Sequence, residues 1–209
     1  MNIISKDELW SSIFRICIII IENEPKLTEI DTIIGDGDHG IGMKRGFTAV
    51  REMLEKNTDL KPYGLLHATG IELVRTMGGA SGVLFGSLFT GGSKTIPKDA
   101  DHLSLEEMAS FFQSGTDTIM QRGKAILGDK TMLDALVPAA KEFSVSVAQG
   151  KGKKECFENA WKASVKGVED TVNMKSKKGR SKNFQDLTIG YPDPGAVSIS
   201  LIFQGFMEK

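Results

Sequence analysis

Apolar side chains recur at helical spacing along most of the chain, and this periodicity decides the class of fold. Large apolar residues stand three or four positions apart in seven segments, which places them on one face of a helix. None of these segments alternates as a half-buried strand does. An all-α bundle with short connections is therefore predicted, with helices in the ranges 10–21, 43–54, 65–77, 84–89, 105–120, 131–143 and 156–172.

Local signals indicate where several of these helices begin and end. Glu24-Pro25 predicts the end of the first helix. Thr131 and Asp134 have the spacing of a capping box that opens the sixth. Residues 197–203 alternate like a strand, whereas Asp193 and Pro194 are typical of the N-cap and first position of a helix. Because no partner strand is visible in the sequence, a final helix is predicted there.

Length, charge and cysteine content restrict the class of protein. A chain of 209 residues has the size of one domain, so 1–209 is expected to form a single unit. The 26 basic and 27 acidic residues give a net charge of -1, which provides no overall attraction to nucleic acid or an anionic membrane. The apolar run Ile16–Ile21 is too short to span a bilayer and lacks signal-peptide flanks. Cys17 and Cys156 form no disulfide or metal pattern, so a cytoplasmic protein is expected.

Three carboxylates and a histidine crowd the glycine-hinged segment Asp31–Gly40. Asp36 and Asp38 project to the same side of an extended backbone, and Asp31 can reach the same point if the chain folds back through Gly35. Like charges this close repel one another unless a cation lies between them. A small set of oxygen ligands suits Mg²⁺, which usually completes its coordination shell with water and substrate phosphates. The segment therefore predicts a metal-nucleotide site.

The same segment has three other interpretations. Gly35, Gly37 and Gly40 have the G-x-G-x-x-G spacing of a dinucleotide fingerprint, but the two intervening aspartates repel a pyrophosphate unless a metal intervenes, and the alternating strands of that fold are not predicted. An EF-hand loop counted from Asp36 fails because its fifth, sixth and twelfth positions are occupied by unsuitable residues. An acidic surface turn that caps a helix stays open at this point.

Two further segments have the composition of phosphate contacts. Gly78–Gly82 places five small residues ahead of an apolar helix, where exposed amides bind phosphate well, although close helix packing explains the same residues. Lys175–Lys182 contains five basic residues. Its lysines are typical of a solvated, flexible tip, whereas Arg180 follows a glycine and offers a forked donor that suits phosphate.

Four segments in order give the chain a resemblance to the nucleotide-binding (L) subunit of dihydroxyacetone kinase. The match is nearly full length. Its segments are the acidic turn with Asp31, Asp36, Asp38 and His39-Gly40; the glycine turn Gly78–Gly82; the middle segment Gly128–Asp134; and the late segment with Gly179-Arg180 and Asp193-Pro194-Gly195.

The resemblance implies an antiparallel barrel or bundle of about eight helices, with a site for ADP or ATP and two Mg²⁺ ions in the loops at one end. Asp31, Asp36 and Asp38 match the family's metal ligands. The positions that match the surroundings of the nucleotide are His39, Gly40, Ile41, Gly42, Ala80, Ser81, Gly123, Met132, Arg180, Asp193, Pro194 and Gly195.

The resemblance also implies an activity, that of a phosphotransferase subunit. It delivers a phosphoryl group to a short ketose held on a separate substrate-binding subunit, so the nucleophile belongs to the substrate and no catalytic side chain is expected here. Either ATP is consumed directly, or ADP stays bound and is rephosphorylated by a phosphotransferase-system donor protein. The sequence leaves open a nucleotide-sensing regulatory module, a related ketose or polyol as acceptor, and a homodimer. No nucleic-acid or membrane partner is expected.

Overall fold

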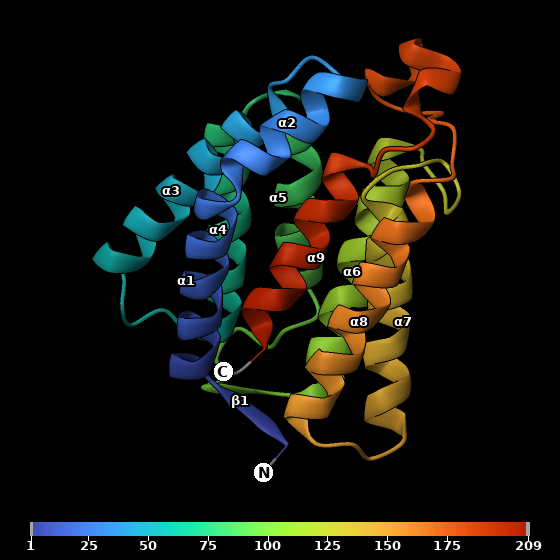
Figure 1. Ribbon diagram of the computed structural model, residues 1–209. Helices are drawn as coiled ribbons and strands as arrows, with labels where there is room; N and C mark the ends of the chain where they lie inside the picture. The colour runs from blue at the N-terminus through green and yellow to red at the C-terminus, as the bar shows by residue number, and fades with distance from the viewer. Residues whose placement is uncertain (1, 208–209) are drawn as a thin grey trace.

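The computed structural model describes residues 2–207, and it is built almost entirely of helices (Figure 1). The predicted all-α class is confirmed. The described residues form helices α1 (Lys6–Glu22), α2 (Glu24–Ile34), α3 (His39–Lys56), α4 (Pro62–Met77), α5 (Gly79–Ser93), α6 (Leu105–Gly123), α7 (Leu133–Ala148), α8 (Lys153–Thr171) and α9 (Pro194–Phe206), a 3₁₀ segment η1 (Ser181–Thr188), and strands β1 (Ile3–Ser5) and β2 (His102–Ser104).

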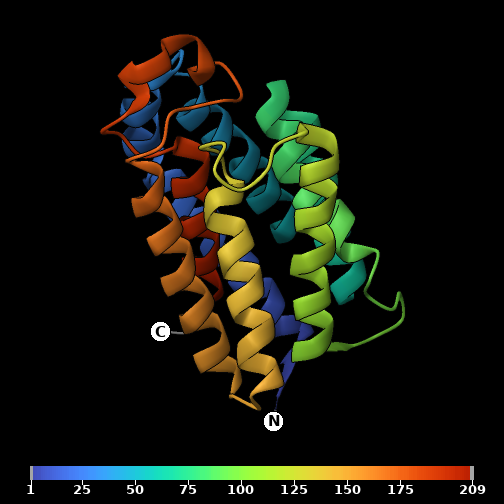
Figure 2. The same cartoon turned by 90° about the vertical axis from the view of Figure 1, so that its right-hand side faces the viewer.

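Eight of these helices close into a ring. From α3 to α9 each helix packs against the next one in the chain, and α1 packs against both α9 and α3, which closes the circle. Helix α2 crosses one end of the ring, at the top of Figure 1. Consecutive members of the ring run in opposite directions, so the N-termini of α3, α5, α7 and α9 all lie at that same end (Figures 1 and 2). We call it the loop end.

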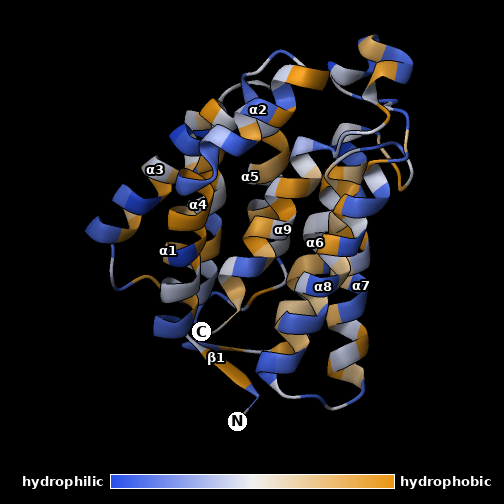
Figure 3. Ribbon diagram, in the orientation of Figure 1, coloured by the Kyte–Doolittle hydropathy of each residue, from blue (hydrophilic) through white to orange (hydrophobic). Residues whose placement is uncertain are grey.

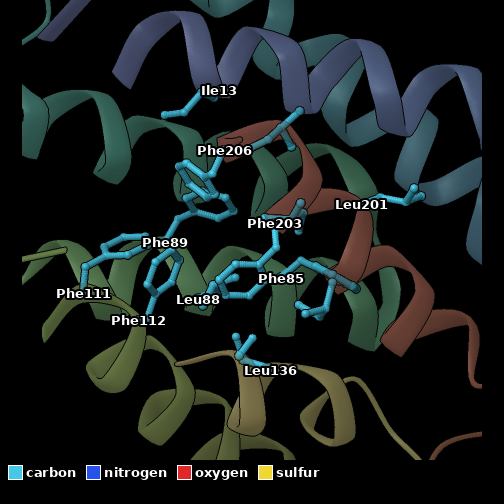
Figure 4. Packing of buried hydrophobic residues seen from close by; sticks show 14 of the residues in the cluster. Ile13, Phe85, Leu88, Phe89, Phe111, Phe112, Leu136, Leu201, Phe203 and Phe206 are labelled. Carbon is cyan, nitrogen blue, oxygen red and sulfur yellow. The ribbon is translucent and has the colours of Figure 1, made fainter. Parts of the chain in front are cut away.

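The ring is held together by apolar faces that point inward (Figure 3). At its centre the buried ring of Phe112 has the rings of Phe111, Phe143, Phe203 and Phe206 around it, with centroids 4.8–5.6 Å apart (Figure 4). Burying one such side chain contributes about 1.5–3 kcal/mol of transfer free energy. These contacts join α6 to α7 and α9, so the core fixes the spacing of the helices whose ends form the loop end.

The two short strands and helix α2 depart from the sequence-based expectation. Strands β1 and β2 pair antiparallel, with Ile3 opposite Ser104, but three residues are too few to show an alternating pattern. At Glu24-Pro25 the predicted break is present, yet a new helix begins there because proline is tolerated in the first helical turn. Asp31 therefore lies on the last turn of α2 instead of in an extended turn.

The final helix was predicted correctly. Pro194 begins α9, and the Asp193 side chain caps it by accepting a hydrogen bond from the amide of Ala196 at 2.7 Å. The alternation of apolar residues from Val197 arises because α9 is buried on nearly all sides. Within the described residues, no helix combines the length and the apolar character needed to cross a membrane.

Candidate functional site

A cavity of about 740 Å³ opens at the loop end of the ring. Its wall is assembled from segments far apart in the sequence: the end of α2, the start of α3, the turn between α4 and α5, the end of α6, and the loops that precede α7 and α9. Alternating helix direction brings these segments together. The cavity is therefore a direct consequence of the antiparallel ring.

Three aspartates converge at one side of this cavity. Oxygens of Asp31, Asp36 and Asp38 all lie within 4.8 Å of one another, and we call these three residues the aspartate cluster. Asp31 is buried, and its Oδ2 accepts a hydrogen bond from the amide of His39 at 3.1 Å. A side chain at Gly35 would collide with the Asp31 carboxylate. The glycine is thus required for Asp31 to approach the other two aspartates.

Arg180 reaches the aspartate cluster from the loop between α8 and α9. Its guanidinium forms an ion pair with Asp36 and lies 3.9 Å from Oδ2 of Asp38. One positive charge offsets one of three carboxylates at most, so the cluster keeps an excess of negative charge. Such an all-oxygen set is suited to a hard divalent cation such as Mg²⁺.

Helix N-termini at the same cavity provide a place for anions. The amides at the start of α5 follow Gly78, whose φ of +74° is a left-handed conformation, and no side chain caps them. Uncapped amides at a helix N-terminus bind phosphate well. The turn is fixed by Arg45, which donates to the carbonyls of Thr76, at 2.6 Å, and Met77 at the end of α4.

His39 lies at the start of α3, but its imidazole is directed into the fold. Nε2 is 2.8 Å from Oγ of Ser198 on α9, and the Ser198 hydroxyl donates to the carbonyl of Pro194 at 3.0 Å. This arrangement makes Nε2 the donor to Ser198. Burial lowers the pKa of His39 to about 4, so the ring is neutral and links α3 to α9.

Asp193 is a second buried ionisable group at the cavity wall. Burial raises its pKa to about 7, and the negative charges of Asp134 and Asp31 act in the same direction. The hydrogen bond from Ala196 and the charge of Lys130 oppose this change. Asp193 therefore titrates near neutral pH in the absence of a cation in the cavity.

The predicted site residues come together at the cavity with one exception. All of them line it except Gly40. A Cβ at Gly40 would come within 2.5 Å of the Glu24 carbonyl and the Thr28 amide, so this glycine allows α3 to pack against α2. Whether the lining residues contact a nucleotide stays a prediction.

The lysines of the late basic run do not form a purely solvated tip. Lys177 donates to the carbonyl of Gly128 at 2.9 Å, Lys178 donates to the carbonyl of Lys124, and both ammonium groups lie within 4 Å of Asp129.

The predicted capping box before α7 is half formed, because the Asp134 carboxylate accepts from the Thr131 amide at 2.7 Å without the reciprocal bond.

Sequence reasoning missed three basic residues of the cavity wall, namely Arg45, Arg122 and Lys130. Arg45 and Arg122 lie on helices where a polar residue at an outward position carries no special signal. Lys130 stands inside the recognised middle segment, but its contacts are with residues more than forty positions away. No local pattern could have indicated them.

Known proteins match this chain along most of its length. The DAK2 domain family model matches residues 33–208. The ADP-binding subunit DhaL of the PEP-dependent dihydroxyacetone kinase of Escherichia coli (strain K12) is 37% identical over 178 residues, which are 85% of this chain and 84% of the relative. The L-erythrulose kinase of Pectobacterium atrosepticum is 32% identical over 188 residues, covering 88% of this chain and 31% of the relative.

A solved structure shows the same fold. The crystal structure of the dihydroxyacetone kinase from C. freundii in complex with AMP-PNP and Mg²⁺ superimposes with a TM-score of 0.73 and 25% sequence identity. The superposition covers 94% of this chain and 32% of that kinase. Together with the sequence matches, it confirms the family resemblance read from the four ordered segments.

The two buried ionisable groups predict opposite dependences of stability on pH. His39 binds a proton less readily when folded, so its contribution to stability is present above pH 6.5 and is lost as the pH falls towards 4. Asp193 binds a proton more readily when folded, so its contribution is present below pH 3.8 and is lost as the pH rises towards 7. The effects are on the order of 3 kcal/mol for His39 and about 4 kcal/mol for Asp193.

Urea unfolding of the metal-free protein between pH 4 and 7 tests this pair of signs. Relative to wild type, Asp193→Asn should gain stability as the pH rises, because the asparagine still caps α9 but has no charge to bury. His39→Gln should gain relative stability as the pH falls. Differences from wild type that do not change with pH would contradict the assignment.

Proposed function

The chain belongs to the DAK2 domain family, and on this premise we propose that it is the ADP/ATP- and Mg²⁺-binding subunit of a dihydroxyacetone kinase-type phosphotransferase. The relatives reported above are themselves kinases or kinase subunits. The observation that carries the proposal is the convergence of three carboxylates within 4.8 Å on one side of a cavity that is also lined by the uncapped turn at the start of α5. A cation site and an anion site that share one cavity suit a metal-bound nucleotide.

The donors of the aspartate cluster fit Mg²⁺. Asp31, Asp36 and Asp38 offer only carboxylate oxygens, and few of them, which leaves coordination positions for water and phosphate oxygens. Bound there, a pair of magnesium ions would neutralise the phosphate charge that develops during phosphoryl transfer. Gly35 and the hydrogen bond from the His39 amide hold Asp31 in place for this role.

The remaining parts of the cavity suit the other parts of a nucleotide. The amides at the start of α5 and the guanidinium of Arg180 are donors for phosphate oxygens. Apolar side chains of Met77, Leu84, Ile119 and Met132 also line the cavity, and they provide a surface for the base. In this proposal the phosphates lie beside the aspartate cluster and the start of α5, and the base lies towards Leu84, Ile119 and Met132.

The acceptor hydroxyl is proposed to belong to a ketose on a separate subunit. Phosphoryl transfer depends mainly on positioning and charge stabilisation and needs no protein nucleophile. His39 is held neutral and bonded to Ser198, so it is not directed towards an acceptor. The relatives include both dihydroxyacetone and erythrulose kinases, so the acceptor class is a short ketose.

ADP is proposed to stay bound as a coenzyme. The E. coli relative is named as the ADP-binding subunit of a PEP-dependent kinase, which supports this version over direct use of ATP. A phosphotransferase-system protein would transfer a phosphoryl group to the β-phosphate of ADP. The γ-phosphoryl group then passes to the ketose hydroxyl, and ADP is left in the cavity for the next cycle.

Apolar side chains around the loop end support a protein partner there. Leu187, Ile126 and Leu127 are 73%, 60% and 56% exposed, and they lie on the two loops beside the cavity. Exposed apolar side chains on the loops that border a cavity are suited to contact with another protein. A substrate-binding subunit docked on this surface would bring its ketose to the open side of the cavity.

Removing one carboxylate of the aspartate cluster tests the nucleotide site. Asp36→Asn and Asp38→Asn should abolish Mg²⁺-dependent binding of ADP, measured by isothermal titration calorimetry, while the circular dichroism spectrum keeps its helical form. Glu29→Gln is the matched control, since it removes one exposed negative charge from α2 without touching the cavity. Unchanged ADP binding by both cluster variants would reject the site.

A coupled assay separates catalysis from regulation. With a substrate-binding subunit and a phosphoryl donor supplied, wild-type protein should support transfer to a short ketose, and the cluster variants should not. Tight ADP binding without transfer to any ketose tested would favour the nucleotide-sensing module instead.

The docking surface makes a separate prediction. Leu187→Glu should lower the rate of phosphoryl transfer at a fixed low concentration of the substrate-binding subunit by about tenfold, because a charge would be buried at the interface, while ADP binding is unchanged. Ile71→Glu, at a side chain 49% exposed on α4 in the ring wall, is the control and should have little effect. Equal losses from the two substitutions would argue against docking at the loop end.

A further inference from the structure

Lys130 is the most deeply buried basic side chain of the cavity wall, with 1% of its surface exposed. It lies on the loop between α6 and α7, residues 124–132, and its backbone has a left-handed φ of 58°. Its side chain passes under the loop between α8 and α9, residues 172–192. Figures 1 and 2 show these two loops side by side at the loop end.

The ammonium group of Lys130 binds three backbone carbonyls of the 172–192 loop. Nζ is 3.1 Å from the oxygen of Met174, 2.5 Å from that of Thr188 and 2.7 Å from that of Tyr191. An ammonium has three N–H donors, so each donor has one acceptor. No other side chain described in this structure joins three points of one loop in this way.

These three carbonyls enclose the base of the loop that presents Arg180. Two other hydrogen bonds close the same base, from the Ser176 amide to the Thr188 hydroxyl at 3.0 Å and from the Gly190 amide to the Val172 carbonyl at 2.8 Å. Residues between them project outwards and carry Gly179-Arg180 to the cavity. Lys130 therefore holds the part of the loop that determines where Arg180 lies.

Loss of the ammonium would leave three carbonyls without their donor, that of Thr188 in a buried place and those of Met174 and Tyr191 in partly buried places. Such groups are costly to leave unpaired, so the base of the loop would open to admit water. Arginine cannot substitute well, because its flat guanidinium does not match three carbonyls that converge on one nitrogen. The geometry requires a lysine or a comparable three-donor group.

We propose that Lys130 is a positioning residue for Arg180. By holding the base of the 172–192 loop, it fixes the position of the guanidinium relative to the aspartate cluster. The proposal rests on the proposed function in so far as Arg180 acts on nucleotide phosphates. Lys130 itself acts through the loop and not on the reacting atoms. Its influence on the nucleotide should therefore vanish when Arg180 is absent.

The first test needs no nucleotide. Lys130→Met keeps the length of the side chain and removes its donors, so hydrogen exchange of amides in residues 172–192 of the metal-free protein should become at least about tenfold faster. Lys182→Met, the same change at an exposed position of that loop, is the control and should leave exchange unchanged. Unchanged exchange in a folded Lys130→Met protein would overturn the proposal.

The second test is a double-mutant cycle on Mg²⁺-dependent ADP affinity. Lys130→Met should weaken binding by about tenfold in the wild-type background and by less than about twofold in the Arg180→Ala background, because the two residues act through one contact. Equal losses in both backgrounds would indicate general structural damage and would also overturn the proposal.

A third variant covers the case in which Lys130→Met does not fold. Lys130→Arg keeps the charge and the apolar stem, and it should show the same faster exchange and the same non-additivity with Arg180→Ala. If wild-type protein fails to bind ADP with Mg²⁺, the proposed function fails, whereas the exchange experiment still decides the role of Lys130.

Discussion

Repulsion among three carboxylates is the constraint around which the loop end is organised. Asp31, Asp36 and Asp38 are held within 4.8 Å, an arrangement that is unfavourable without compensating charge. The fold supplies part of the compensation through Arg180 and the amide of His39. The rest is left for a bound cation. The cluster is therefore suited to a cation that completes the compensation.

The antiparallel ring explains how a helical protein can hold such a site. Each helix that runs away from the loop end begins there, so four N-termini with their partial positive charge surround the cavity. The phenylalanines around Phe112 fix the spacing between α6, α7 and α9 at the level of the core. Loops can then carry the polar residues without contributing much to the stability of the ring.

Two loops complete the cavity by binding one another. Asp129 and Lys130 on one loop hold Lys177, Lys178 and the base of the other. Arg180 is thereby placed opposite the aspartate cluster although α8 and α2 are remote in the sequence. The same loops expose Leu127 and Leu187 to solvent, so the loops that hold Arg180 also carry the surface that we propose for docking.

The sequence predicted those features that depend on local pattern. Helical spacing identified most of the ring, the N-cap at Asp193 outweighed the strand-like alternation of α9, and the glycines around Asp36 and Asp38 indicated their convergence with Asp31. Helix α2 was missed because Pro25 ends one helix and begins another, and a proline gives the same signal in both cases. The lysine contacts were missed because hydrogen bonds between Lys130 and residues 174–191 have no periodicity.

The proposed function requires that the aspartate cluster and the helix N-termini form one magnesium-nucleotide site. Native mass spectrometry of the purified protein reports bound nucleotide and metal together. The expected species carries one ADP and two Mg²⁺ ions and loses both when magnesium is chelated. A protein that carries neither, even after incubation with ADP and Mg²⁺, would contradict it.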